Sequence, residues 1–234
     1  MNPHPRTVEM VDVRKVFNAG RPNAFQALAG VSLTIPLRGV TVFKGPSGSG
    51  KTTLLSVLGC MSRPTAGRVY VDGEEVTSLP EKFLTEIRRK TFGFVFQHFN
   101  LVKGLTVLEN VMLPAYPLGQ PRPALRERAL RLLETFSMGP KAESKVEWLS
   151  GGEAQRAAIA RALINDPPVI IADEPTAHLD SKLSGEFVEM VRDIAGQGRA
   201  VLIASHDPLV VESDLLSAAV EMRDGAVVAP EPPA

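Results

Sequence analysis

The sequence has little sulfur and no long hydrophobic run. Its single cysteine, Cys60, cannot form an internal disulfide, which suits a reducing cytoplasmic compartment. Cys60 lies in an apolar helical pattern, so we expect a small core residue. No segment approaches the roughly 18 consecutive apolar residues of a membrane span, and the first residues lack the apolar stretch of a secretory signal. We therefore expect a cytoplasmic chain that stays at a membrane only where another protein holds it.

Net charge is the second absence. Twenty-six basic residues balance twenty-six acidic ones, so no overall field favours nucleic acid or anionic lipid as a partner. The four histidines are scattered and there is one cysteine, a pattern that does not support a zinc-type site. With 44% hydrophobic residues, the 234-residue chain can still bury a full core, as one large domain or two small ones.

Apolar runs of strand length recur along the chain between helical patterns. They are nearly continuous and rich in β-branched residues, which is typical of parallel strands buried on both faces, and they cover residues 39–45, 92–97, 169–174 and 200–206. Asp-Gly pairs predict two hairpins, over 68–76 and 219–228. The alternation of strands and helices predicts an α/β fold with a mostly parallel sheet.

The strand signal stops between about residues 98 and 165. Within that region one apolar stripe at helical spacing comprises Leu125, Ala129, Leu132, Leu133 and Phe136. We expect a helical insertion at about 98–165 in a core formed by about 1–97 and 166–229. Residues 1–230 are then one domain, and the proline-rich residues 230–234 are a disordered tail.

A glycine-rich motif follows the first buried run. It fits the pattern G-x-x-x-x-G-K-[ST] and comprises Gly45, Pro46, Ser47, Gly48, Ser49, Gly50, Lys51 and Thr52, with Thr53 next in the helix. Its backbone N–H groups can surround phosphate oxygens, and a helix N-terminus adds positive potential. Lys51 would reach the β- and γ-phosphates, and the Thr52 hydroxyl would bind Mg²⁺. The alternative is a strand–helix turn with an incidental lysine. The strand and helix on either side favour the nucleotide site.

Two carboxylates end the third buried run, at Asp173 and Glu174. Charges at the end of a buried strand are costly unless they face a cation or a cleft. Asp173 suits a partner of Mg²⁺, and Glu174 can polarise an attacking water. Taken alone, the same two residues could equally be acidic residues at a strand end beside a surface loop. Together with the glycine-rich motif, they favour a catalytic site.

A second glycine pair opens the stretch LSGGE at residues 149–153. Ser150 and Glu153 form a capping-box pattern before an alanine-rich helix, which on its own indicates scaffolding. Gly151 and Gly152 are poor helix formers, and we expect both to leave the backbone bare in the first turn. The stretch is therefore either a capped helix or a place that holds a ligand.

With these residues placed, the chain resembles an ATPase subunit of ABC transporters over about residues 8–228. Gln97 in FVFQHFNL matches the family's glutamine loop, and LSGGE matches its signature. AHLD ends at Asp180 as the D-loop, and ASHD supplies His206 as the switch histidine. The resemblance implies a P-loop NTPase core with a mostly parallel sheet, an N-terminal antiparallel β part and an inserted helical subdomain.

The resemblance also implies how the motifs work together. ATP and Mg²⁺ are the expected ligands, with Gln97 sensing Mg²⁺ and Glu174 and His206 acting at the γ-phosphate. Two copies, or two related cassettes, pack head to tail, so that the signature of one covers the nucleotide of the other. Ser150 and the glycines then face a γ-phosphate in the partner's site, while Glu153, where many relatives have Gln, points back to the cap. Asp180 would link the two sites.

Some positions depart from the family pattern. Phe17 stands where the family often has Tyr on the adenine ring, and it is either a stacking residue or a core residue. His178 is bulkier than the usual residue and is expected at the dimer interface. His98 is expected to be a loop or partner contact, and His4 lies in the N-terminal segment, which we expect to be mobile. None of the three is expected to bind a metal.

The sequences of residues 93–114 and 172–181 resemble the lipoprotein-release and macrolide-export ATPases of bacteria. That resemblance implies a membrane permease as partner and a location on the inner face of the cell membrane. The groove near Phe99, Leu101 and Leu105 is the expected dock for the permease. Export, lipoprotein release and mechanical signalling all remain open. A soluble ABC protein acting on nucleic acid or ribosomes is the alternative, but the chain lacks a coiled-coil insertion, a second cassette and a basic surface.

Overall fold

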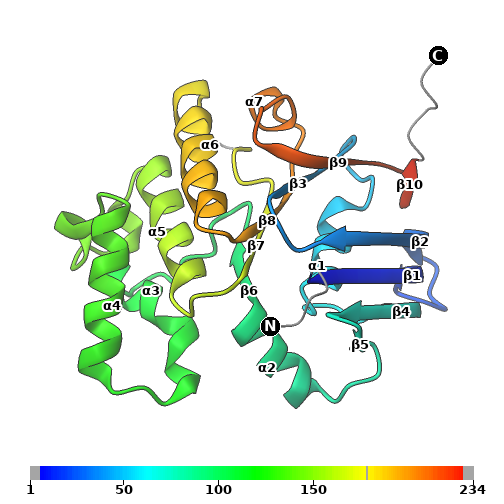
Figure 1. Ribbon diagram of the computed structural model, residues 1–234, viewed down its shortest axis with the longest axis horizontal. Coiled ribbons are helices and arrows are strands. Elements are labelled where there is room, and N and C mark those ends of the chain that lie inside the picture. Colours follow the sequence, from blue (N-terminus) through cyan, green and yellow to red (C-terminus); the bar gives the residue numbers. More distant parts are fainter. Residues whose placement is uncertain (1–5, 178, 229–234) are drawn as a thin grey trace.

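In the computed structural model, which describes residues 6–177 and 179–228, the chain forms two β-sheets with helices around them (Figure 1). The larger sheet has six strands in the order β10-β9-β3-β8-β7-β6. Their bounds are β3 Val40–Lys44, β6 Phe92–Val95, β7 Val169–Asp173, β8 Ala200–Ala204, β9 Leu216–Arg223 and β10 Ala226–Val228. All neighbouring pairs are parallel except β9 and β10. The four predicted strands are thus confirmed as parallel neighbours.

The smaller sheet is antiparallel and has the order β2-β1-β4-β5. Its strands are β1 Thr7–Phe17, β2 Phe25–Pro36, β4 Ala66–Val71 and β5 Glu74–Glu75. Both predicted hairpins form, β4 with β5 and β9 with β10. Asp72 and Asp224 adopt positive φ angles of 52° and 48° in the two turns, which an Asp-Gly pair tolerates. The N-terminal antiparallel part expected from the resemblance is therefore present.

Four helices accompany the two sheets: α1 Lys51–Leu58, α2 Glu81–Thr91, α6 Ser181–Gly196 and α7 Pro208–Val211. The apolar face of α6 packs on the sheet through Phe187, Val191 and Ile194, which are all buried. Helix α1 buries its apolar residues in a second cluster, together with Cys60 and residues of the antiparallel sheet. Cys60 is a core residue as expected, and burial raises the pKa of its thiol to about 11.

The region between β6 and β7 is helical. It contains α3 Val107–Met112, α4 Arg122–Thr135 and α5 Gly151–Leu163, with three short 3-10 turns at Leu113–Leu118, Gly139–Lys141 and Val146–Trp148. Figure 1 shows these helices on one side of the parallel sheet and the antiparallel sheet on the other. The predicted stripe of α4 lies in the core, with Leu125, Ala129, Leu133 and Phe136 buried and Leu132 half-buried.

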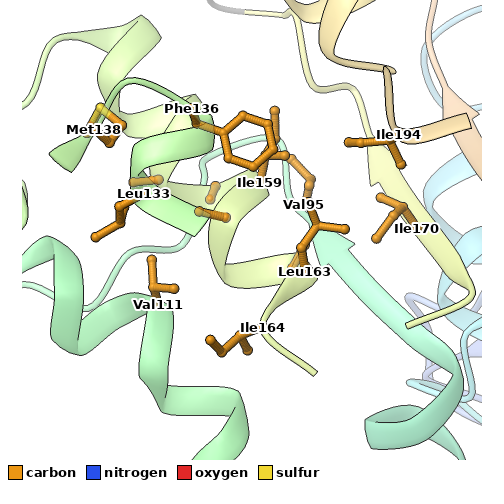
Figure 2. Close-up of a cluster of buried hydrophobic side chains, with 14 of the residues drawn as sticks. Val95, Val111, Leu133, Phe136, Met138, Ile159, Leu163, Ile164, Ile170 and Ile194 are labelled. Atoms are coloured by element: carbon orange, nitrogen blue, oxygen red, sulfur yellow. The ribbon is translucent and has the colours of Figure 1, made fainter. Parts of the chain in front are cut away.

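One continuous core joins this helical region to the parallel sheet. Leu133 and Phe136 from the α4 end face Ile159 and Leu163 of α5, and Val95 and Ile170 of the sheet lie beyond them (Figure 2). The middle and the end of α5 are therefore held against strands β6 and β7 of the parallel sheet. Within the described residues, no helix is both long enough and apolar enough to cross a membrane.

Candidate nucleotide site

The glycine-rich motif forms the connection between β3 and α1. Gly45 has a φ of 149°, and a Cβ there would lie 2.2 Å from the carbonyl oxygen of Met222. Gly50 has a φ of 100°, and a Cβ there would lie 2.6 Å from the carbonyl oxygen of Ala27. Only glycine fits these two places, because both the conformation and the space exclude a side chain. The loop is thereby drawn tightly against β9 and β2.

Helix α1 begins without a side-chain cap. Gly50 is its N-cap residue and supplies no acceptor for the first backbone N–H groups. Within the loop, Ser49 is buried and its Oγ has no hydrogen-bond partner among the described residues. Pro46, Ser47 and Gly48 form the turn itself, and Thr53 is half-buried in the first turn of α1. Unsatisfied donors around a glycine turn are what a bound phosphate requires.

Lys51 is folded back over this loop. Its Nζ donates to the carbonyl oxygens of Gly45 at 2.8 Å and Pro46 at 3.1 Å, and it lies 3.4 Å from Oε1 of Glu174. Only 6% of its side chain is exposed. A buried ammonium in this position is available to anionic oxygens that enter the loop.

Two oxygen atoms that could bind a cation meet at the first turn of α1. The Thr52 hydroxyl donates to Oδ1 of Asp173 at 2.9 Å, which joins the first turn of α1 to the end of β7. Burial raises the pKa of Asp173, and the hydrogen bond from Thr52 opposes that shift. Across the described residues, no group of three or more His, Cys, Asp and Glu side chains could hold a metal alone. A hydroxyl with one carboxylate instead fits Mg²⁺ that is also bound by phosphate.

Glu174 sits at the centre of the converging side chains. Its φ is 45°, a left-handed conformation, and its N–H donates to the carbonyl oxygen of Ala204 at the end of β8. Its Oε2 lies 2.9 Å from Nδ1 of His206, and its other oxygen faces Lys51. The parallel pairing of β7 and β8 explains the meeting, because both residues follow the carboxyl ends of adjacent strands.

Gln97 follows β6 at the same edge of the sheet. Val95 of β6 pairs with Ala172 of β7, so Gln97 and Asp173 leave neighbouring strands in the same direction. Two and three residues further along this loop, Phe99 and Asn100 have φ angles of 58° and 48°. Phe99 and Leu101 pack against the core of the helical region.

Arg161 of α5 holds this loop. Its two terminal nitrogens donate to the carbonyl oxygens of Asn100 and Phe99, each at 2.5 Å. The side chain is buried, and burial lowers the pKa of its guanidinium to about 10. We did not predict a role for Arg161, because an arginine in an alanine-rich helix gives no sign of contacts some sixty residues away.

The signature stretch forms the predicted capping box. The Ser150 hydroxyl accepts from the N–H of Glu153 at 3.3 Å, and Oε2 of Glu153 accepts from the N–H of Ser150 at 2.8 Å. Hydrogen bonding, first from the Ser150 N–H and then from neighbours including Lys141, lowers the pKa of Glu153. Nζ of Lys141 lies 3.2 Å from its other oxygen. The prediction that Glu153 points back to the cap is confirmed.

The two glycines after Ser150 differ from each other. Gly151 is exposed, as predicted, but Gly152 is buried, so the prediction of two bare glycines is wrong at the second position. A Cβ on Gly152 would lie 2.7 Å from a methyl group of Leu183 in α6. Gln155, one turn further on, donates to the carbonyl oxygen of Pro175 at 3.0 Å. The first turn of α5 is therefore packed on α6 and tied to the segment that follows Glu174.

Two further predicted positions lie at the edges of the site. Asp180 caps α6 through a hydrogen bond from the N–H of Leu183 to its Oδ1 at 2.9 Å, and it is exposed. Phe17 ends β1 opposite Phe25, is 42% exposed and lies beneath the Lys15 ammonium, 5.1 Å from the ring centroid. The core alternative for Phe17 is therefore wrong. His178 and His4 lie outside the described residues.

These features together define a nucleotide-binding α/β protein. A glycine loop, a helix start without a cap, a buried lysine and a carboxylate pair converge at the carboxyl edge of a parallel sheet. The arrangement can bind a triphosphate and a divalent cation, and it can activate a water beside them.

Comparisons with known proteins agree. The sequence profile of the ABC transporter family matches residues 28–177. An ABC transporter ATP-binding protein of uncharacterised role from Thermotoga maritima is 41% identical over 222 residues, covering 95% of this chain and 94% of the relative. The macrolide export ATP-binding/permease protein MacB of Rhodospirillum rubrum is 42% identical over 224 residues, covering 96% of this chain. The chain spans about a third of the length of that relative, 34%.

Solved structures give the same answer. The dimeric ATP-binding cassette MJ0796, in a post-hydrolysis state bound to ADP and Pi, superposes with a TM-score of 0.85 at 38% identity. The match covers 95% of this chain and 97% of that one. A nucleotide-free cassette from an ABC transporter gives a TM-score of 0.82 at 26% identity. The chain belongs to the ABC transporter family of ATP-hydrolysing cassettes.

Proposed function

We propose that the chain hydrolyses ATP in a head-to-tail dimer and thereby drives a membrane permease. The observation that carries the proposal is the position of Glu174, between Lys51 of the glycine loop and His206 of the next strand. A carboxylate held in this way can orient water for attack on a γ-phosphate, while the imidazole donates to the phosphate oxygens. Glu174 is thus the proposed general base, and His206 assists it.

The remaining predicted residues fit binding roles in the same proposal. The backbone of Gly45 to Thr53 and the Lys51 ammonium would hold the phosphates, and Thr52, Asp173 and Gln97 would hold Mg²⁺ directly or through water. Mg²⁺ would neutralise charge that develops on the phosphates. The exposed ring of Phe17 would stack on the adenine. Asp180 lies at the end of the segment that leads from Glu174 to α6.

The proposed dimer is supported by what the start of α5 offers a ligand and by a dimeric relative. The start of α5 presents Ser150 and the exposed Gly151. Its own carboxylate, Glu153, is already bonded within the capping box and paired with Lys141. It can hold a phosphate without supplying any catalytic group. MJ0796, a bacterial ABC transporter cassette, is dimeric, and this supports the same arrangement for the present chain.

The permease is the second partner. MacB relatives are named ATP-binding/permease proteins, and the present chain matches about a third of their length. A hollow beside the edge strand β6 is lined by Phe94, Phe96, Leu113, Pro114 and Arg161. It lies next to the loop held by Arg161, so a permease helix seated there could move Gln97. We propose export of a small molecule, lipoprotein release or mechanical signalling as the work performed, on the inner face of the cell membrane.

The Glu174→Gln variant tests the proposal. We expect it to bind Mg-ATP with unchanged affinity and to lose turnover about a thousandfold, because the general base is gone. Sedimentation should then detect an ATP-dependent dimer that persists. Glu127→Gln on the exposed face of α4 is the control and should hydrolyse ATP at the normal rate. Unchanged turnover in Glu174→Gln would refute the general base, and a monomer under saturating Mg-ATP would refute the dimer.

A further inference from the structure

The tryptophan at position 148 is an unusual surface residue. It is the only tryptophan of the chain, and 75% of it is exposed, more than any other large hydrophobic side chain among the described residues. A tryptophan ring buries on the order of 200 Å² when it is covered, so leaving it in water forgoes a large apolar contribution. Neither the site described above nor the core uses this ring.

The backbone that carries the ring is held in place. Lys145 donates from Nζ to the carbonyl oxygen of Gly104 at 2.6 Å, and Oε1 of Glu147 accepts from the N–H of Gly104 at 2.6 Å. The N–H of Val146 donates to the carbonyl oxygen of Leu105 at 3.3 Å. Trp148 closes this 3-10 turn through its own N–H, which donates to the carbonyl oxygen of Lys145. An exposed ring on a fixed backbone loses little conformational entropy when a partner covers it.

Trp148 directly precedes the signature stretch, residues 149–153. Leu149 and Ser150 are extended, with ψ angles of 141° and 165°, so the Cα atom of Trp148 lies roughly 7 Å before that of Ser150. Gly151, immediately beyond, is exposed as well. Leu149, between Trp148 and Ser150, is half-buried against the core, whereas Trp148, Ser150 and Gly151 are exposed. The ring and the half-site for phosphate therefore belong to one short surface segment at the entrance to α5.

We infer that Trp148 is an anchor of the ATP-bound dimer, buried against a second copy of this chain when the signature turn covers the partner's nucleotide. The inference rests on the proposed head-to-tail dimer. It adds that the ring forms an apolar contact beside the shared phosphate site. Rigid, exposed tryptophan side chains next to polar half-sites match the hot spots of protein interfaces. The similar cassette MJ0796 is dimeric, and one of its structures has ADP and Pi bound, which supports a second copy as the occupant.

Intrinsic fluorescence tests this directly, because every tryptophan photon comes from one position. In Glu174→Gln, addition of Mg-ATP should shift the emission maximum to shorter wavelength and lower the iodide quenching constant at least threefold. The change should grow with protein concentration, in step with the dimer fraction from sedimentation. Moving the reporter, by Trp148→Phe combined with Phe83→Trp on the exposed face of α2, should abolish the change while the dimer still forms.

Three outcomes would overturn the inference in different ways. A dimer seen by sedimentation with an emission spectrum and quenching constant like those of the monomer would refute the anchor and leave the proposed function intact. A spectral change that is independent of protein concentration would also refute it, because the cover would then come from the same chain. Absence of any dimer would refute the proposed head-to-tail arrangement together with the anchor.

A side-chain series measures the contribution of the ring. In the Glu174→Gln background, Trp148→Ser should raise the dimer dissociation constant about thirtyfold, whereas Trp148→Phe should raise it only severalfold. Phe83→Ser removes an exposed ring from α2 and serves as the matched control, with an unchanged constant. ATP affinity of the dilute monomer should be the same in all three. An equal loss in Trp148→Ser and Phe83→Ser would overturn the inference.

Discussion

Helices α1 and α5 both begin beside glycines. They differ in which groups accept hydrogen bonds from the backbone N–H groups of the first turn. Helix α1 follows Gly50, which offers no side-chain cap, and the nearest carboxylates, Asp173 and Glu174, come from another strand. Helix α5 begins with a capping box, in which Glu153 is bonded to its own turn and to Lys141. The start of α1 thus leaves backbone N–H donors unsatisfied next to side chains that can act in catalysis. The second is complete as a helix start and has no free carboxylate for chemistry.

Under the proposed function, the start of α1 is a binding site with its catalyst, and the start of α5 is a site that only binds. If the second turn served a nucleotide of its own chain, it would need a lysine and a carboxylate pair, and among the described residues those converge only on α1. A split site also explains why α5 is so firmly connected to both neighbouring loops. Gln155 bonds to the segment after Glu174, and Arg161 bonds to the loop after Gln97.

The largest effect on ATP affinity should come from a substitution at the start of α1. Lys51→Ala removes a buried ammonium that lies against Gly45, Pro46 and Glu174, so we expect ATP affinity of the monomer to fall about a hundredfold. Titration calorimetry on dilute protein measures it. Lys44→Ala is the matched control, because that lysine ends β3 one residue before the loop and pairs with Glu221 on the surface. Equal losses in the two variants would show that charge near the loop, and not the position of Lys51, determines binding.

A substitution at the start of α5 should show the opposite pattern, in which the monomer keeps its ATP affinity and turnover falls. Ser150→Arg places a long cation in the half-site, so we expect ATP affinity of the monomer within twofold of normal and turnover reduced about a hundredfold. The loss should appear with the loss of ATP-dependent dimers in sedimentation. Ser78→Arg, at an exposed position before α2, should change neither quantity. Loss of monomer binding in Ser150→Arg would place both glycine turns on one nucleotide and end the distinction.

Sequence patterns predicted the elements whose signal is local. The buried strands carry continuous apolar runs, and the glycine loop lies between a strand and a helix, so the fold class and the neighbourhood of Lys51, Asp173 and Glu174 were predictable. The capping box of Ser150 and Glu153 has a spacing that is visible in any single sequence. The strands, the glycine loop and the capping box can each be inferred from residues that are close along the chain. The meeting of Lys51 with Asp173 and Glu174 was expected from the complementary chemistry of the glycine-rich motif and the two carboxylates.

Contacts between distant segments could not be predicted in the same way. Burial of Gly152 depends on Leu183, and the contact of Arg161 depends on carbonyl groups of a loop some sixty residues earlier in the chain. The left-handed conformation of Glu174 is set by its hydrogen bond to Ala204 on a neighbouring strand. The exposure of Trp148, a residue type that is usually highly buried, also follows from tertiary structure. Side-chain type and spacing carry no information on any of these.

Arg161 provides a test of how α5 is held at its far end. Arg161→Gln removes two hydrogen bonds to carbonyl groups of Phe99 and Asn100, which both have left-handed backbones, so we expect the free energy of unfolding to fall by about 2 kcal/mol. Urea denaturation measures it. Arg131→Gln on α4 is the control, since its pair with Glu127 is exposed and contributes at most about 0.5 kcal/mol. Similar values for the two variants would mean that Arg161 does not hold the loop.

The smallest effect tests whether the capping box that we propose binds phosphate differs from one with a structural role alone. Helix α3 begins with the same box, Thr106 and Glu109, but buried Val107 and Leu108 follow it where α5 has glycines. Thr106→Ala and Ser150→Ala should each lower the free energy of unfolding by about 1 kcal/mol in urea. Hydrogen bonding lowers the pKa of both glutamates, so each box contributes fully above the ordinary glutamate pKa, about 4.3. Each contribution disappears as the pH falls through the lowered value.

Only Ser150→Ala should affect catalysis. Its hydroxyl is the one that we place against the partner's nucleotide, so steady-state turnover should fall about tenfold, equivalent to one lost hydrogen bond of about 1.4 kcal/mol in the closed dimer. Thr106→Ala should keep normal turnover at temperatures where both variants are folded. If the two substitutions lowered turnover equally, the start of α5 would be no more than a well-capped helix, and the difference between the two glycine turns would be one of stability alone.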